Sequence, residues 1–335
     1  MSLVAIGRNA FLESIRQPVF VVLLLGGTLA MALNVSLAAF TLEDDNKLLI
    51  DLGLSTLFLA GLLLAAFAST SVLTREIENK TVLTVVSKPV PRAALVVGKY
   101  LGIVAALTLA YWALAAVFLL SVRHRVQESV RIDDSFDVPV LVFSLGFGGL
   151  ALAGAALANY LYRRPFASVF AVSYAIAMTA ALGVVWCVTR EWEFQDPRVE
   201  WNPQLMIALG LVYQAILVLA SVAIAASTRL SQTLTLLVCV GCFVVGLVSE
   251  YFLGTLLTTP VADAAQPAAG MLARGLLWPL YVLIPNLQYF WPADALTQGH
   301  VITLEYFATV SLYAWLVIGG LISLAVLLFQ GRDVS

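Results

Sequence analysis

Residues 205–227 read LMIALGLVYQAILVLASVAIAAS, and this stretch decides the class of fold. It contains no Asp, Glu, Lys, Arg or His. A helix rises about 1.5 Å per residue, so a run of this length is enough to cross roughly 30 Å of hydrocarbon. In lipid every backbone amide must find its hydrogen-bond partner within the protein, and a helix provides one for each. The stretch therefore predicts a membrane-spanning helix.

Seven further stretches have the same character. The complete set of predicted spans is 18–40, 51–73, 98–121, 138–161, 166–188, 205–227, 231–252 and 306–329. Over the whole chain 61% of the residues are hydrophobic and 11% are charged, whereas soluble domains carry about 25% charged residues. The first run is too long for the apolar region of a signal peptide, which has about 7 to 15 residues. We expect one all-α integral membrane domain with about eight transmembrane helices.

The positions of Lys and Arg predict the orientation. These residues collect on one side of the predicted membrane, from Arg8 through Lys99, Arg163 and Arg229 to Arg332. The other side carries most of the Asp and Glu and the longer loops. Cytoplasmic loops are enriched in Lys and Arg, so we expect both chain termini in the cytoplasm. The formal net charge of −2 gives no reason to expect nucleic acid as a partner.

Residues 258–305 do not fit the simple pattern of spans. Within them the segment 271–284, MLARGLLWPLYVLI, is apolar but short, and it contains Arg274 and Pro279. Such a length suits a re-entrant or interfacial helix better than a span. Aromatic residues, which prefer the headgroup level, cluster around it. We expect 258–305 to form a cap on the outer face; if 271–284 crossed instead, the C-terminus would lie outside.

The interiors of the predicted spans contain no ionisable side chain. Asp51, Lys99 and Glu250 are at span ends, near water, and His124 and His300 fall in predicted outer loops. A transporter driven by protons or sodium needs ionisable groups at mid-membrane, where each costs at least about 2.5 to 3.5 kcal/mol. Proton-driven transport is therefore not expected from this chain, although backbone carbonyls could still coordinate sodium.

No catalytic, cofactor-binding or metal-binding residue is expected either. The chain has no GxxxxGKS or GxxxxGKT phosphate cradle, and its Gly98-Lys99 pair is followed by Tyr100. Cys239 and Cys242 are three apart and could hold a soft ion such as Cu(I). Free Cys is, however, a common small hydrophobe in apolar surroundings, and that interpretation is favoured.

Two polar side chains stand out within the spans, Asn159 and Gln214. They are candidates for lining a substrate path. The favoured alternative is that they form hydrogen bonds between helices.

The longest predicted inside loop covers residues 74–97. Polar residues at 75–80 precede an apolar strip within 82–86, at the spacing of a helix face. Pro91 can begin the next helix, because proline is favoured in a first turn. The loop predicts a short amphipathic helix that lies across the inner mouth and docks on a soluble partner. The alternative is a helix that only anchors the loop in the interface.

This loop also contains an ordered set of residue types: an Arg-Glu pair, a Thr, a Lys-Pro step and a Gly-Lys pair that opens the third span. These are Arg75, Glu76, Thr81, Lys88, Pro89, Gly98 and Lys99. Residues 2–17 add an amphipathic N-terminal helix, with Val4, Phe11 and Ile15 opposite Arg8 and Arg16. In these features the chain resembles the permeases of ABC type-2 transporters. The resemblance covers roughly the first third of the chain, and members commonly have six spans where this chain has eight and a cap.

The resemblance implies the partners and the coupling residues. In that family two permease halves pair with two ATPase subunits, and the loop after the second span contacts the ATPase. The residues implied in ATPase coupling here are Arg75, Glu76, Glu78, Asn79, Lys80 and Thr81. ATP would be bound by the partner subunit, the chain itself would need no cofactor, and a second permease copy or a paralogue would complete the complex in the membrane lipid.

We therefore expect the permease subunit of an ABC-type exporter, in the cell membrane and most simply the bacterial inner membrane. Two alternatives stay open from the sequence. One is a secondary transporter or channel, and the other is a non-transporting membrane scaffold that recruits an ATPase.

Overall fold

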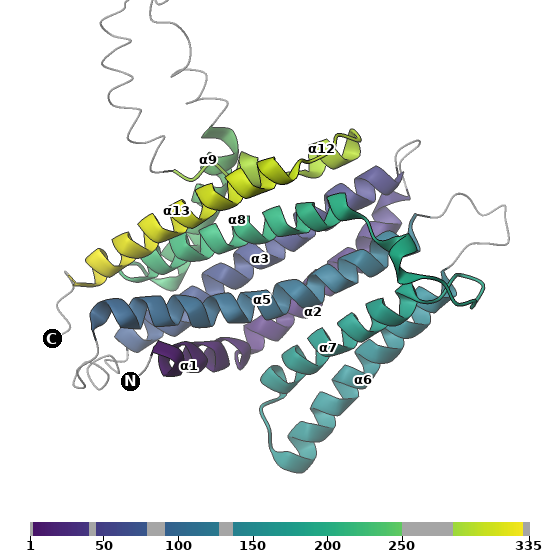
Figure 1. Cartoon of the computed structure of the whole chain (residues 1–335). Helices are drawn as coiled ribbons and strands as arrows, with labels where there is room; N and C mark the ends of the chain where they lie inside the picture. Colours follow the sequence, from purple (N-terminus) through teal and green to yellow (C-terminus); the bar gives the residue numbers. More distant parts are fainter. Residues whose placement is uncertain (1–2, 40–44, 79–90, 127–136, 250–283, 331–335) are drawn as a thin grey trace, which may run out of the picture.

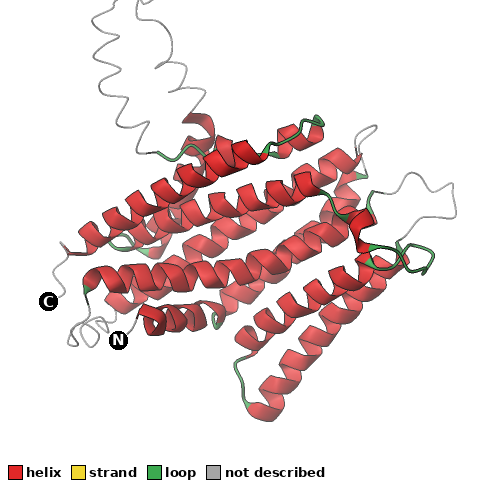
Figure 2. Ribbon diagram, in the orientation of Figure 1, coloured by secondary structure: helices red, strands yellow, loops and turns green. Residues whose placement is uncertain are grey.

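The computed structural model describes residues 3–39, 45–78, 91–126, 137–249 and 284–330, which are helical apart from turns and one isolated β-bridge (Figure 2). The long helices are α1 (Leu3–Ile15), α2 (Pro18–Ala38), α3 (Asp45–Glu78), α5 (Arg92–His124), α6 (Val138–Tyr162), α7 (Phe166–Trp186), α8 (Pro203–Ser227), α9 (Gln232–Ser249) and α13 (Leu304–Gln330). The short ones are η1 (Pro197–Glu200), η4 (Gln288–Phe290) and α12 (Ala293–Thr297). Eight of these helices, all the long ones except α1, are long and apolar enough to cross a membrane. The predicted all-α membrane class is confirmed.

Two helices extend beyond the spans expected from hydropathy. α3 continues to Glu78, so residues 74–78, which were expected in a loop, are helical. α5 begins at Arg92, six residues before the predicted start of its span. Hydropathy marks only the length that hydrocarbon covers, whereas Arg, Glu, Leu and Ala support a helix in water as well. The loop between these two helices is therefore shorter than the sequence suggested.

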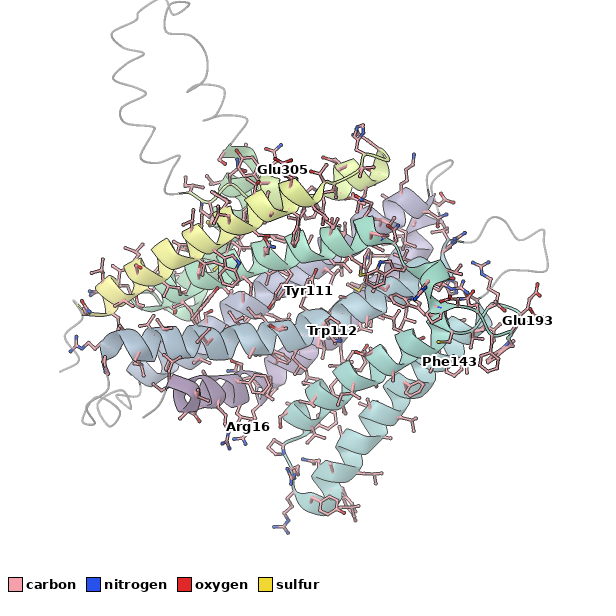
Figure 3. All side chains as sticks on the ribbon, in the orientation of Figure 1. Arg16, Tyr111, Trp112, Phe143, Glu193 and Glu305 are labelled. Atoms are coloured by element: carbon pink, nitrogen blue, oxygen red, sulfur yellow. The ribbon has the colours of Figure 1, made fainter. Side chains whose placement is uncertain are left out.

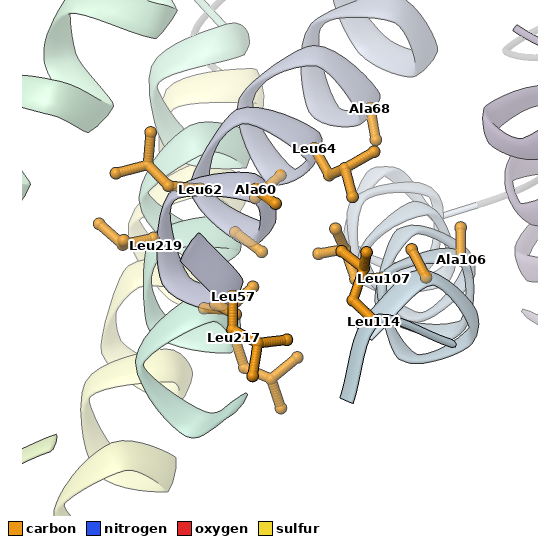
Figure 4. Packing of buried hydrophobic residues seen from close by; sticks show 14 of the residues in the cluster. Leu57, Ala60, Leu62, Leu64, Ala68, Ala106, Leu107, Leu114, Leu217 and Leu219 are labelled. Carbon is orange, nitrogen blue, oxygen red and sulfur yellow. The ribbon is translucent and has the colours of Figure 1, made fainter. Parts of the chain in front are cut away.

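α3 lies at the centre of the bundle, between α5 and α8 (Figures 1 and 4). Leu57 of α3 packs near Leu217 of α8, and on the other side Leu64 faces Leu107 of α5. The most apolar part of α8 is 78% buried, against 17% for α6. The core is therefore formed by α3, α5 and α8, while α6 lies at the edge with most of its surface exposed.

Glycines allow the central helices to approach closely. A Cβ atom at Gly53 of α3 would collide with the ring of Phe118 on α5, and a Cβ at Gly61 would collide with Ile216 on α8. Small residues at such positions are the usual basis of close helix contact in membranes, because lipid provides no hydrophobic force between helices. The two glycines thus set the distance of α3 from both of its neighbours.

One end of the bundle, here called the basic end, carries the arginines Arg92, Arg163, Arg164 and Arg229. The Arg92 guanidinium donates to the carbonyl of Gln330 over 2.8 Å, which joins the start of α5 to the end of α13. α1 packs against the start of α5, and the two chain termini lie at this end of the bundle (Figure 1). The N-terminal helix, the end of α3 and the end of α13 therefore share one end, as the predicted topology requires.

An ionic cluster at the opposite end fastens the hairpin of α6 and α7 to α5. The carboxylate of Asp137, which has no exposed surface, lies 2.8 Å from Arg123 Nη1 and 3.5 Å from Arg190 Nε. Glu200 Oε1 lies 3.0 Å from Arg123 Nε, without the alignment of a hydrogen bond. Asp137 also caps α6 by accepting a hydrogen bond from the backbone amide of Val140. The cluster therefore joins α5, the start of α6 and the segment before α8.

The position of His124 differs from the one predicted from the sequence. It was expected in an outer loop, but it is the last residue of α5 and is 8% exposed. Hydrogen bonding explains why α5 extends this far, since the amide of Val126 just beyond it donates to Asn46 Oδ1 at the start of α3.

The described part of the predicted cap, residues 284–305, covers α3, α8 and α9 at the end of the bundle opposite the basic end. The amide of Leu287 donates to the Gly246 carbonyl, and the amide of Ile302 donates to Gln204 Oε1. Trp291 meets Phe58 of α3 edge to face, with ring centroids 5.9 Å apart. Residues 258–283 of the predicted cap, and with them almost all of 271–284, lie outside the described residues.

Candidate functional site

Three of the six residues implied in ATPase coupling lie at the basic end, where α3 ends. Arg75, Glu76 and Glu78 are on the last turns of α3. Asn79, Lys80 and Thr81, together with the amphipathic strip that follows them, lie outside the described residues. The first half of the predicted coupling segment is thus a continuous extension of a core helix. A push on these residues would reach the centre of the bundle directly.

Lys99 holds this end of α3, and its environment differs from the one predicted from the sequence. It was expected near water, but it is 3% exposed. Its ammonium donates to the carbonyl of Val72 on α3 over 2.7 Å. A buried ammonium is unfavourable unless it is hydrogen-bonded, so this contact fixes the side chain in place. The bond joins the start of α5 to α3 one turn before Glu76.

α1 lies directly on the start of α5, next to Lys99. The side chain of Ile6 rests on Gly98, where an added Cβ would come within 2.9 Å of it. A Cβ at Gly102 would collide with the Gly7 carbonyl and approach the Ala10 Cβ to 2.6 Å. The contact is therefore made between glycine backbones, one turn apart on α5, and tolerates no larger residue.

The buried face of α1 agrees with the predicted one at Ile15 and, partly buried, at Phe11, but not at Val4. Ile6, Ala10 and Ile15 are buried, whereas Val4 is 76% exposed. Helical spacing predicts that α1 has an apolar side. It does not predict that Val4, although apolar, lies exposed. Glycine contacts decide which residues turn inward here, and the sequence pattern does not reveal them.

The two polar side chains proposed for a substrate path are far apart and have structural partners. Gln214 of α8 donates from Nε2 to Ser311 Oγ of α13 over 2.8 Å, while its Oε1 is buried without a partner. Asn159 is exposed near the end of α6 and donates to the Arg164 carbonyl over 2.7 Å. α6 and α13 lie on different sides of the bundle (Figure 1). The structure does not bring the two residues together.

A polar face at mid-span was missed by the sequence analysis. Thr108 of α5 bonds to the hydroxyl of Tyr213 on α8, and the Trp112 indole donates to Thr179 of α7 over 2.8 Å. Both hydrogen bonds are exposed, and Trp112, which is labelled in Figure 3, is 59% exposed. The exposed residues of α2, by contrast, include the leucines Leu25, Leu29, Leu33 and Leu37. The sequence feature that could have indicated this face is the spacing of Thr108 and Trp112, which are four residues apart and therefore lie on one side of a helix.

No metal or catalytic constellation occurs among the residues that the structure describes. No group of three or more His, Cys, Asp or Glu in these ranges is arranged to hold a metal ion. Cys239 is buried in a small cluster with Ala66 and Ala223, and the described cysteines form no disulfide.

Comparison with known families agrees with this geometry. The model of a family described as ABC-2 family transporter protein matches residues 29–232, which is more than half of the chain. The match runs from within α2 to the start of α9, so it includes the coupling segment, the polar face and spans well beyond those on which the resemblance was based. A comparison with curated proteins finds no match. The chain therefore belongs to the ABC-2 transporter family and is a membrane-embedded permease component of an ABC-type transporter.

Proposed function

We propose that this permease exports its substrate with energy from ATP that a separate ATPase subunit binds and hydrolyses. The observation that carries the proposal is the junction at the basic end. There the segment Arg75–Glu78 continues a core helix, and Lys99 and α1 clamp the neighbouring turns. An ATPase that moves Arg75 to Thr81 would therefore move α3, α5 and α1 together.

The energy source follows from the chemistry that the spans carry. The sequence has no phosphate-binding loop, so the chain cannot hydrolyse nucleotide by that route. The interior stretches of the predicted spans lack ionisable residues, and the buried Lys99 and His124 lie near the two ends of α5. A coupling ion would need titratable groups at mid-membrane. The simplest remaining arrangement is that a separate ATPase subunit supplies the energy for transport.

The proposed orientation places the basic end in the cytoplasm. Arg163, Arg164 and Arg229 occupy the short turns at this end, and Lys and Arg in short loops favour the cytoplasmic side. ATP is available there, so the coupling segment and the ATPase would meet on the same side. We place the complex in the cell membrane, with a second copy of this chain or a paralogue as the other permease half.

The polar face of Thr108, Tyr213, Trp112 and Thr179 is the proposed substrate-facing wall. Hydroxyl and indole groups on an outer surface at mid-span find no hydrogen-bond partners in lipid, although they can bond to each other across helices. They are better placed against a polar substrate or the second permease half. This role replaces Asn159, which lies in a turn, and leaves Gln214 as a bridge to α13.

Charge reversal at Glu76 tests the ATPase coupling. In a complex reconstituted with the ATPase that co-purifies with the permease, Glu76→Lys should lower permease-stimulated ATP hydrolysis about tenfold or more, because like charges across an interface cost several kcal/mol. The measurement is phosphate release in proteoliposomes with and without permease.

Glu305→Lys is the matched control, since Glu305 is exposed at the other end of the bundle, at the start of α13 (Figure 3). It should leave stimulation unchanged. Equal stimulation by wild type and Glu76→Lys would count against the coupling role. An ATPase that co-purifies but never turns over with transport would indicate a scaffold instead.

A further inference from the structure

A pocket of about 610 Å³ lies between α2, α5, α6 and α7. Its walls are mainly aliphatic and aromatic and include Leu25, Val35, Val117, Leu145, Phe170 and Met178. It extends from Thr28 and Tyr174, in the middle of α2 and α7, to His124 at the opposite end of the bundle. Neither the coupling segment nor the polar face contributes to it.

The pocket opens sideways, toward the medium around the bundle. Leu25, Leu145 and Leu152 line it and are 41%, 73% and 48% exposed. All four helices around it are candidate spans, so the medium at this depth is the hydrocarbon of the bilayer. Whatever fills the pocket must therefore come from the bilayer or from a protein within it.

Four of the five hydroxyl groups in the wall already have partners within the protein. The Thr28 hydroxyl lies 2.9 Å from the Tyr174 hydroxyl. Ser121 donates to the Val117 carbonyl, and Ser144 lies within hydrogen-bond distance of the Leu141 carbonyl. A water molecule needs two to four polar partners to occupy a cavity, and an empty apolar cavity loses packing energy. The wall thus suits an occupant without hydrogen-bonding groups.

Glycines on α6 create the space. A Cβ at Gly149 would meet no atom within 4 Å, and one at Gly148 would make only ordinary contact with Met178 and Tyr174. α6 contacts α7 closely but stands off from α2 at this level, so the pocket separates α6 from α2.

We propose that this pocket binds an acyl chain of a phospholipid from the surrounding bilayer. The headgroup would lie at the opposite end from the coupling segment. There His124 lines the pocket, and the exposed Arg125 follows it, which supplies a cation at the depth of a phosphate. The lipid fills the gap between α6 and α2, and the ionic cluster around Asp137 joins α5 to the start of α6 at that end of the gap.

The test uses a phosphatidylglycerol with a photoreactive diazirine in its acyl chain, mixed into vesicles of phosphatidylethanolamine and phosphatidylglycerol that contain the full-length permease. Crosslinks located by mass spectrometry should concentrate on pocket residues such as Leu145 and Met178. Gly149→Trp, which places an indole in the pocket, should reduce these crosslinks about tenfold. Gly149→Leu should reduce them less.

Gly154→Trp is the matched control. Gly154 is on the same helix, also has open space around a Cβ, and does not line the pocket. It should leave crosslinking at Leu145 and Met178 unchanged. Equal crosslinking there in Gly149→Trp and Gly154→Trp protein, both eluting as folded complexes, would overturn the proposal. So would a Leu145→Cys variant that crosslinks efficiently to a second permease copy, since a protein would then cover the pocket.

Discussion

Asp137→Ala is expected to lower the free energy of unfolding by about 3 to 5 kcal/mol, the usual result of removing one partner from a buried ion pair. Its carboxylate contacts the guanidinium groups of Arg123 and Arg190. Without it Arg123, which is 10% exposed, would keep Glu200 as its one counterion among the described residues. The variant also loses the hydrogen bond to Val140 that caps α6.

The measurement is the unfolding transition of the detergent-solubilised protein, followed by the accessibility of buried Cys239. Asp196→Ala is the control, because Asp196 also caps a helix, by accepting from the Arg198 amide, but is exposed and is in none of the ion pairs described above. Loss of an exposed cap costs about 1 kcal/mol. Equal losses in the two variants would show that the ionic cluster contributes little.

Gly102→Val is expected to displace α1 from α5 and to uncouple ATP hydrolysis from transport. The new side chain would collide with the backbone of Gly7 and crowd Phe11, whose amide would lie 2.9 Å from the added Cβ. A helix backbone cannot yield as a flexible side chain does, and overpacking of this kind costs about 1 to 3 kcal/mol. Detachment of α1 is the easiest relief, and it would expose Lys99.

A cysteine at Ser14 reports the displacement, because Ser14 is 1% exposed in α1. With Gly102→Val the thiol should react with a maleimide much faster than in the parent. Gly26→Val is the control, since a Cβ at Gly26 of α2 meets nothing within 4 Å. If the Ser14→Cys thiol stays protected in both backgrounds, the glycine contact does not hold α1.

The eight candidate spans among the described residues, and their helical type, were predictable from the sequence, because lipid forces backbone groups to pair within each segment. Their ends were not. α3 reaches Glu78 and α5 starts at Arg92 because helix formation does not stop where hydrocarbon stops. The place of Arg75, Glu76 and Glu78 on a core helix was therefore hidden by the same hydropathy that located the spans.

Contacts between side chains of different helices were harder to predict from the sequence. Lys99 was expected near water, but it is buried beside the contact of α1 with Gly98 and Gly102, which joins segments distant in sequence. In the sequence, nothing distinguishes Thr108 and Tyr213 from other residues of apolar spans. Packing of the two helices brings them together on an outer face. Such pairings depend on tertiary packing, which periodicity within one helix does not specify.

The most direct test of the central claim is transport by the purified permease in vesicles, with and without the co-purifying ATPase. The vesicles contain a lipid and metabolite extract of the source cells, and mass spectrometry identifies what crosses. The account predicts transfer only with the ATPase and ATP, and none under an imposed proton or sodium gradient with the permease alone. Gradient-driven transfer by the isolated chain would contradict it.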